Sequence, residues 1–156
     1  MNLVNKETGL RISIEQSLVD TLVLYGRNQY PKEFGGVLVG CYSDDKRTVN
    51  VIDSILPIDF KSTKTTFERG VEGLKEALEE YYRQNPSLVY IGEWHTHPNA
   101  APVPSCTDYY AMREIVDASS VCIDNPVMII IGLTENSEKL AFYVYMENKF
   151  YKYEII

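Results

Sequence analysis

Both histidines of this 156-residue chain lie two positions apart, in His95-Thr96-His97-Pro98, and a carboxylate follows at Asp108. Seven residues separate His97 from Ser105, and two more separate Ser105 from Asp108. A catalytic zinc takes three protein ligands from such nitrogen and oxygen donors and keeps its fourth position for water. The pattern therefore predicts one Zn²⁺ per chain, bound by His95, His97 and Asp108.

The predicted secondary structure brings these donors together. Residues 88–96 read as a buried central strand, in which alternate side chains share a face, so His95 and His97 project to one side and Trp94 to the other. Pro98 ends the strand. A helix predicted over 105–119 follows a proline-stiffened loop.

The start of that helix places the third donor. Ser105 suits the N-cap and Asp108 the N3 position, one turn away and facing the cap. The same pair is also a capping box that needs no metal. Only the histidines upstream favour the metal site over simple capping. Cys106 would point away from the ion, about 200° around the helix from Asp108, so we do not expect it to be a ligand.

Such a site needs a proton carrier that is not a ligand, and two glutamates compete for that role. Glu33 precedes the glycine-rich segment 34–40, whose paired glycines permit close backbone approach. Glu93 shares the strand face of the histidines. It lies roughly 6 to 7 Å farther along the strand from His95, where it better suits holding an imidazole in place. We therefore favour Glu33 as the base.

The remaining elements interleave strands and helices, with a loop expected over 57–67. The order predicts an α/β sheet layered with helices. In this pattern 70–85 is the clearest helix, with an apolar stripe of Val71, Leu74, Leu78, Tyr81 and Tyr82. The other predicted strands are 10–14, 34–42, 48–56, 127–133, 140–146 and 150–155, and the other predicted helix is 15–28.

These residues resemble the JAMM motif of the JAB/MPN+ metallopeptidases. Glu33, the His95-Thr96-His97 triplet, Ser105 and Asp108 match it at every functional position, and Gly36-Val37-Leu38-Val39-Gly40 is similar to the family's Gly-x-Leu-x-Gly segment. The resemblance implies a single domain over 1–156 with the MPN fold. This is a cytidine-deaminase-like α/β fold whose central mixed, largely antiparallel sheet is flanked by helices.

The resemblance also implies a mechanism and a substrate class. Zinc would activate a water, Glu33 would take its proton and later deliver it to the departing amine, and Ser105 would donate a hydrogen bond to the oxyanion. The chain looks most like bacterial stand-alone members associated with ubiquitin-like conjugation and anti-phage signalling operons. The implied partner is a protein conjugated through its C-terminus, a ubiquitin-like protein or an operon-encoded signalling enzyme.

Alternatives remain open at this point. A peptidase for small sulfur-carrier proteins would use the same residues, and an MPN-type interaction scaffold would need none of them. If a conjugated tail binds, we expect it to be extended along a sheet edge, with the loop 57–67 as one wall of its groove.

The composition of the chain disfavours several other classes of protein. A net charge of −7 and a pI of about 4.8, with no basic patch, disfavour nucleic-acid binding. No apolar run approaches the ~20 residues that cross a bilayer, and the N-terminal residues lack a signal peptide's apolar core. Three widely spaced cysteines favour free thiols. We therefore expect a cytoplasmic protein without a membrane or nucleic-acid partner.

Overall fold

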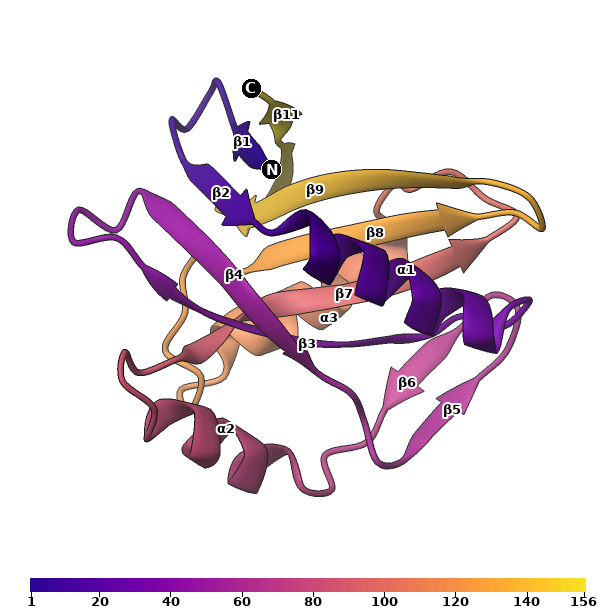
Figure 1. The fold of residues 1–156 in the computed structure, drawn as a ribbon, viewed down its shortest axis with the longest axis horizontal. Helices are drawn as coiled ribbons and strands as arrows, with labels where there is room; N and C mark the ends of the chain where they lie inside the picture. The colour runs from indigo at the N-terminus through magenta and orange to yellow at the C-terminus, as the bar shows by residue number, and fades with distance from the viewer.

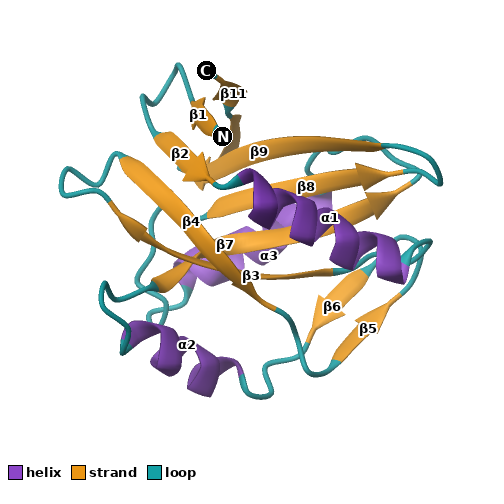
Figure 2. Cartoon of the chain, viewed as in Figure 1, coloured by secondary structure: helices purple, strands orange, loops and turns teal.

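A computed structural model describes residues 1–156 of the chain. Three helices and eleven strands follow one another (Figures 1 and 2). The helices are α1 (Gln16–Gln29), α2 (Leu74–Tyr82) and α3 (Cys106–Asp117). The strands are β1 (Asn2–Val4), β2 (Arg11–Ile14), β3 (Gly35–Tyr42), β4 (Thr48–Ile55), β5 (Phe60–Ser62), β6 (Phe67–Arg69), β7 (Val89–Pro98), β8 (Val127–Leu133), β9 (Glu138–Met146), β10 (Lys149–Lys152) and β11 (Glu154–Ile155).

Nine strands form one mixed sheet in the order β10-β9-β8-β7-β3-β4-β2-β1-β11. Only the pairs β2/β4 and β7/β8 are parallel, so the sheet is largely antiparallel, as expected. The strand that carries both histidines, β7, lies in the middle between β3 and β8. Helices α1 and α3 cover opposite faces, with α1 in front of the sheet and α3 behind it in Figure 1.

Each face of the sheet has its own apolar core. The larger one, on the α1 side, holds 18 buried residues, including Leu22 of α1 and Trp94 of β7. The smaller one, on the α3 side, holds six, including Met112 of α3. Burial of this kind is the main favourable contribution to folding. The two cores therefore fix β7 from both sides.

The predicted C-terminal strand 150–155 is wrong in one respect, because it is divided at Tyr153. Strand β10 pairs with β9 at one edge of the sheet, whereas β11 pairs with β1 at the other. Tyr153 between them is buried in the larger core and donates its N–H to the Phe142 carbonyl. One short segment thus satisfies backbone groups at both edges of the sheet.

The segment 57–67 was expected to be an irregular loop, and this prediction is also wrong. Strands β5 and β6 form a separate two-stranded antiparallel sheet within 60–69. Phe60 and Phe67 lie 5.1 and 5.8 Å from Phe34, measured between ring centroids. Such aromatic contacts contribute beyond simple burial. The hairpin is therefore stabilised by packing on a distant part of the chain.

The helix predicted over 70–85 is shorter than expected. Gly73, with a φ of 70°, occupies the left-handed region at its N-cap, so α2 begins only at Leu74. No residue of α2 is fully buried. In the predicted stripe, Val71 and Tyr82 are exposed. The amphipathic pattern is present, but the rest of the protein covers it only in part.

Candidate metal centre

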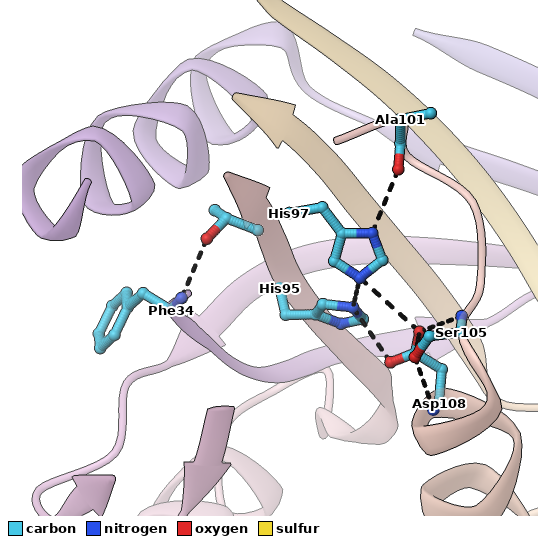
Figure 3. A network of polar contacts seen from close by, with 7 residues as sticks. Phe34, His95, His97, Ala101, Ser105 and Asp108 are labelled. Carbon is cyan, nitrogen blue, oxygen red and sulfur yellow. Dashed lines mark hydrogen bonds and ion pairs between the residues drawn. The ribbon is translucent and has the colours of Figure 1, made fainter. Parts of the chain in front are cut away.

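The three predicted metal ligands meet on the α3 side of the sheet (Figure 3). The Nε2 atoms of His95 and His97 lie 2.9 Å apart. The Nε2 atom of His95 is 3.1 Å from Oδ1 of Asp108, and that of His97 is 3.7 Å from Oδ2. All three side chains are about nine-tenths buried. A tetrahedral zinc with bonds of about 2.0 to 2.1 Å places its ligand atoms roughly 3.3 Å apart, so this donor set fits such an ion.

Strand β7 gives both imidazoles the same direction, as strand alternation predicts. Its neighbour β3 lies close enough to seat them, because Gly35 is paired with His95 in register. A Cβ atom on Gly35 would lie 2.1 Å from the Trp94 carbonyl oxygen. No side chain larger than hydrogen fits there. The glycine-rich segment therefore permits the close approach beside the site that the sequence indicated.

The tautomer of His97 suits metal binding. Its Nδ1 lies 3.2 Å from the Ala101 carbonyl oxygen, an acceptor only, so the proton belongs on Nδ1 and the Nε2 lone pair faces the site. Burial, together with the nearby His95, lowers the pKa of His97 below its usual 6.5. The imidazole is therefore neutral near pH 7, the form that binds a metal ion.

The carboxylate of Asp108 caps helix α3 and also faces the two histidines. Its Oδ2 accepts hydrogen bonds from the Ser105 backbone N–H, at 2.5 Å, and from the Ser105 hydroxyl, at 2.7 Å. The Asp108 N–H donates in turn to the Ser105 hydroxyl, which completes a capping box. Its other oxygen, Oδ1, faces His95. The cap thus orients the carboxylate that faces the imidazoles.

The side chain of Asp108 is ionised. Burial opposes its ionisation, but the hydrogen bond and positive field of His95 and the hydrogen bonds from Ser105 outweigh that cost. They lower the pKa of Asp108 to about 2. The carboxylate is therefore an anionic donor at neutral pH.

Glu33 lies beside this cluster, immediately before β3. Phe34 exchanges two hydrogen bonds with Thr96, at 2.9 and 2.8 Å, so Glu33 is held next to the histidine end of β7. Its half-buried carboxyl has a raised pKa, because burial outweighs the opposing effect of His95, and Asp108 adds to the rise. A carboxyl with a raised pKa close to the metal donors is suited to proton transfer.

Glu93 does not hold an imidazole in place, and that expectation is wrong. Its carboxylate accepts two hydrogen bonds from Arg69, at 2.8 and 3.1 Å, and one from the Tyr90 hydroxyl at 3.0 Å. Arg69 lies 24 positions from Glu93 in the chain, so strand periodicity does not predict this pairing. One signal was available. Gly92 marks a β-bulge in β7, and the bulge brings Tyr90 to the same side as Glu93.

Three further side chains near the site can be compared with the sequence. Cys106 is exposed and lies outside the cluster of metal donors, as predicted. Trp94 is buried on the α1 side, also as predicted. Tyr109 of α3 is 40% exposed, and its ring packs edge-on against Phe150 at 4.7 Å.

Comparison with known proteins agrees with the fold. A family model described as prokaryotic homologs of the JAB domain matches residues 15–145. The chain belongs to this family. The solution structure of protein DSY2949 from Desulfitobacterium hafniense has the same fold, with a TM-score of 0.67 at 20% identity over 93% of this chain and 91% of that one.

Several bacterial relatives bear names of hydrolases. A CD-NTase/cGAS isopeptidase of Enterobacter hormaechei subsp. hoffmannii is 38% identical over 122 residues, 78% of this chain and 67% of that protein. A probable metalloprotease, y4qB, of Sinorhizobium fredii is 32% identical over 130 residues, 80% and 78% of the two chains. A CD-NTase/cGAS isopeptidase of Vibrio cholerae is 30% identical over 64% of this chain and 62% of its own length.

These findings define a hydrolase of the JAB peptidase type. The donor cluster is compatible with a metal ion, as the metalloprotease name of one relative also indicates. None of the three helices combines the length and apolarity needed to cross a bilayer.

Proposed function

We propose that this protein is a zinc-dependent isopeptidase that releases a protein conjugated through its C-terminus. The observation that carries the proposal is the convergence of His95, His97 and Asp108, with Glu33 beside them, in a chain of the JAB family. His95, His97 and Asp108 would hold one Zn²⁺. Two imidazoles and a carboxylate that leave a position for water are typical of catalytic zinc.

Zinc at this site would supply a Lewis acid that polarises the scissile carbonyl and acidifies water. Glu33 takes the proton of the attacking water, since its raised pKa lets it hold that proton, and then delivers it to the departing amine. Ser105 donates a hydrogen bond to the oxyanion. Its hydroxyl, on an exposed residue, donates to Asp108 in this structure and must rotate away to do so. An oxyanion contact is typically worth about 2.7 to 4 kcal/mol.

The names of two relatives support the choice of substrate. Both are called CD-NTase/cGAS isopeptidases, and one is 38% identical to this chain. We infer that the protein released here is an enzyme of that class, or a ubiquitin-like protein, linked to a lysine amine. The conjugated tail would lie extended along the β5–β6 hairpin, whose sheet has only two strands and so offers unpaired edges.

The decisive experiment incubates the zinc-loaded protein with a panel of conjugates. The panel contains a CD-NTase and a ubiquitin-like protein, each linked to a lysine amine, linear fusions of both, and a fusion to a sulfur-carrier protein. Glu33→Ala and a chelated sample serve as controls. We expect cleavage of an isopeptide-linked conjugate, and neither control should cleave it. Glu33→Ala should nevertheless keep its zinc, because Glu33 is not a ligand.

Four results would change the proposal. Cleavage of the sulfur-carrier fusion alone would assign the other peptidase function. Full activity after chelation would remove the metal from the mechanism. Absence of cleavage anywhere, with zinc bound, would favour the interaction scaffold. Zinc content near zero in Glu33→Ala would contradict the division of roles between ligand and base.

The hairpin itself is tested by substitution instead of deletion, because Glu33 is bonded to it and a deletion would disturb the base. Lys61 and Lys64 are exposed on the hairpin. Changing both to Glu should raise KM for a protein conjugate and leave kcat unchanged, if the hairpin forms one wall of the groove for the tail. An unchanged KM would remove the hairpin from substrate binding.

A further inference from the structure

We propose that Arg69, Glu93 and Tyr90 form a positioning network that holds the β5–β6 hairpin, and through it Glu33, against the metal-binding end of β7. The inference rests on the proposed function, in which Glu33 is the base. None of the three residues would touch the substrate or the ion. They would act by fixing where the Glu33 carboxylate lies relative to His95.

The first step is the bond between β6 and β7. Arg69, the last residue of β6, places Nη2 at 2.8 Å and Nε at 3.1 Å from the two carboxylate oxygens of Glu93. This is a two-bond fork, in which the planar guanidinium fixes direction as well as distance. The side chains are only 22% and 14% exposed.

Tyr90 completes the pairing from within β7. Its hydroxyl donates to Oε1 of Glu93 at 3.0 Å. Burial and the neighbouring Glu93 raise the pKa of Tyr90 well above its usual value, so the hydroxyl remains a donor. Glu93 is therefore bonded on both sides, and its position along β7 is fixed two residues before His95.

The second step joins the same hairpin to Glu33. The Glu33 N–H donates to the Thr63 carbonyl at 2.8 Å, and the Ser62 hydroxyl donates to the Glu33 carbonyl. Both backbone polar groups of Glu33 are thus bonded to the residues at the end of β5. Because β5 and β6 are paired in register from Phe60↔Arg69 to Ser62↔Phe67, Arg69 anchors the opposite end of the hairpin.

Stability alone is a poor reason for this arrangement. A buried ion pair is costly to desolvate, and well-packed apolar residues of similar size are often as good. What the pair adds is a fixed geometry between two segments 24 residues apart. Glu33 is then held from two directions, by the Phe34–Thr96 hydrogen bonds to β7 and by the hairpin that Arg69 fastens to the same strand.

The experiment compares Arg69→Met/Glu93→Gln, which removes both charges and leaves neither buried alone, with Tyr90→Phe and Arg69→Lys. Arg27→Met is the matched control, because it breaks another arginine–glutamate pair, Arg27 with Glu138, on a different part of the molecule. Zinc affinity, kcat, KM and the hydrogen exchange rate of the Glu33 amide are measured for each. The exchange rate is measured on the folded, metal-free protein.

We expect the double variant to keep its zinc affinity but to lose kcat by about 10- to 100-fold, the scale of a misplacement of about 1 Å. The Glu33 amide should exchange at least about tenfold faster, because the hairpin that protects it is loosened. Arg69→Lys should recover only part of kcat, since an ammonium cannot make the two-bond fork. Tyr90→Phe should show the smallest loss, and the control should match the unmodified protein.

A kcat within twofold of the unmodified protein, in a folded double variant with an unchanged Glu33 exchange rate, would overturn the proposal. So would an equal loss in Arg27→Met. If the double variant does not fold, Tyr90→Phe and Arg69→Lys decide by the same exchange measurement. The exchange rate needs no substrate, so it tests the network even if no conjugate is cleaved and the proposed function fails.

Discussion

The two sides of β7 differ sharply in chemistry although they belong to one ten-residue strand. On the α1 side, Trp94 and Thr96 are almost completely buried in a packed interior. On the α3 side, Glu93, His95 and His97 carry polar groups that face other polar groups. The strand alternation puts the two sets within a few ångströms of each other without mixing them. The buried side chains of one face thus lie directly behind the polar site of the other.

The largest effect is expected when one of the proposed zinc ligands on the α3 side of β7 is removed. His97→Ala and Asp108→Ala should each reduce zinc affinity by about 100- to 1000-fold, because four ligands share a binding free energy of roughly 10 to 16 kcal/mol at structural zinc sites. Cleavage of a conjugate should be lost with the metal. Zinc affinity is measured by competition with a chromophoric chelator. A metal-free His97→Ala that has also lost its fold would show that the two sides of β7 are not independent.

The converse change is Trp94→Ala on the α1 side. Trp94 is 1% exposed, and its Nε1 donates to the Ser54 hydroxyl at 2.7 Å. We expect the free energy of unfolding to fall by about 3 to 5 kcal/mol, the usual cost of such a cavity. Urea denaturation measures the loss. The exposed Tyr110, changed to Ala, is the control and should move the midpoint little.

A substitution at Thr96 should affect both the core on the α1 side of β7 and the site on its α3 side, with a smaller loss of stability. Thr96→Val removes the hydroxyl that accepts from the Phe34 N–H at 2.9 Å and leaves that buried donor unpaired. Stability should fall by about 1 to 3 kcal/mol. Because Phe34 follows Glu33, kcat should fall as well, and urea denaturation with kinetics at saturating substrate separates the two effects. A loss of stability with an unchanged kcat would confine Thr96 to the core side.

The smallest expected effect is the pH dependence of zinc affinity. Burial, together with His95, lowers the pKa of His97 below 6.5, so its imidazole stays neutral until the pH falls under that value. Protonation of His97 should therefore leave zinc affinity unchanged above pH 6.5, and below the lowered pKa it should reduce the affinity by up to about tenfold per pH unit. Asp108, whose pKa is about 2, keeps its charge throughout. Affinity that already declines between pH 8 and 7 would contradict a lowered His97 pKa.

Much of the site could be predicted because its signals are local. Strand β8 has the predicted bounds, and α3 begins directly after the predicted cap at Ser105. Alternation along a strand and the geometry of a capping box depend only on residues a few positions apart. The faces of His95 and His97 and the direction of Asp108 follow from those two rules.

The sequence-based predictions are wrong where contacts between distant segments determine the secondary structure. The residues 60–69 have little strand pattern of their own and form a hairpin because their phenylalanines pack on Phe34. The C-terminal strand divides at Tyr153 because its two halves pair with opposite edges of the sheet. Neither partner can be recognised from the local sequence.

The amino-acid sequence by itself predicted the three side chains that the structure brings together and the face on which they lie, because periodicity and capping act over a few residues. Only the tertiary structure showed what surrounds each of the two glutamates. Glu93 shares the histidines' face, yet its carboxylate is paired with Arg69, whereas the carboxyl of Glu33 lies beside the cluster with a raised pKa. The physical reason is that the charge of a buried carboxylate depends on which groups surround it, and here those groups come from strands far apart in the chain.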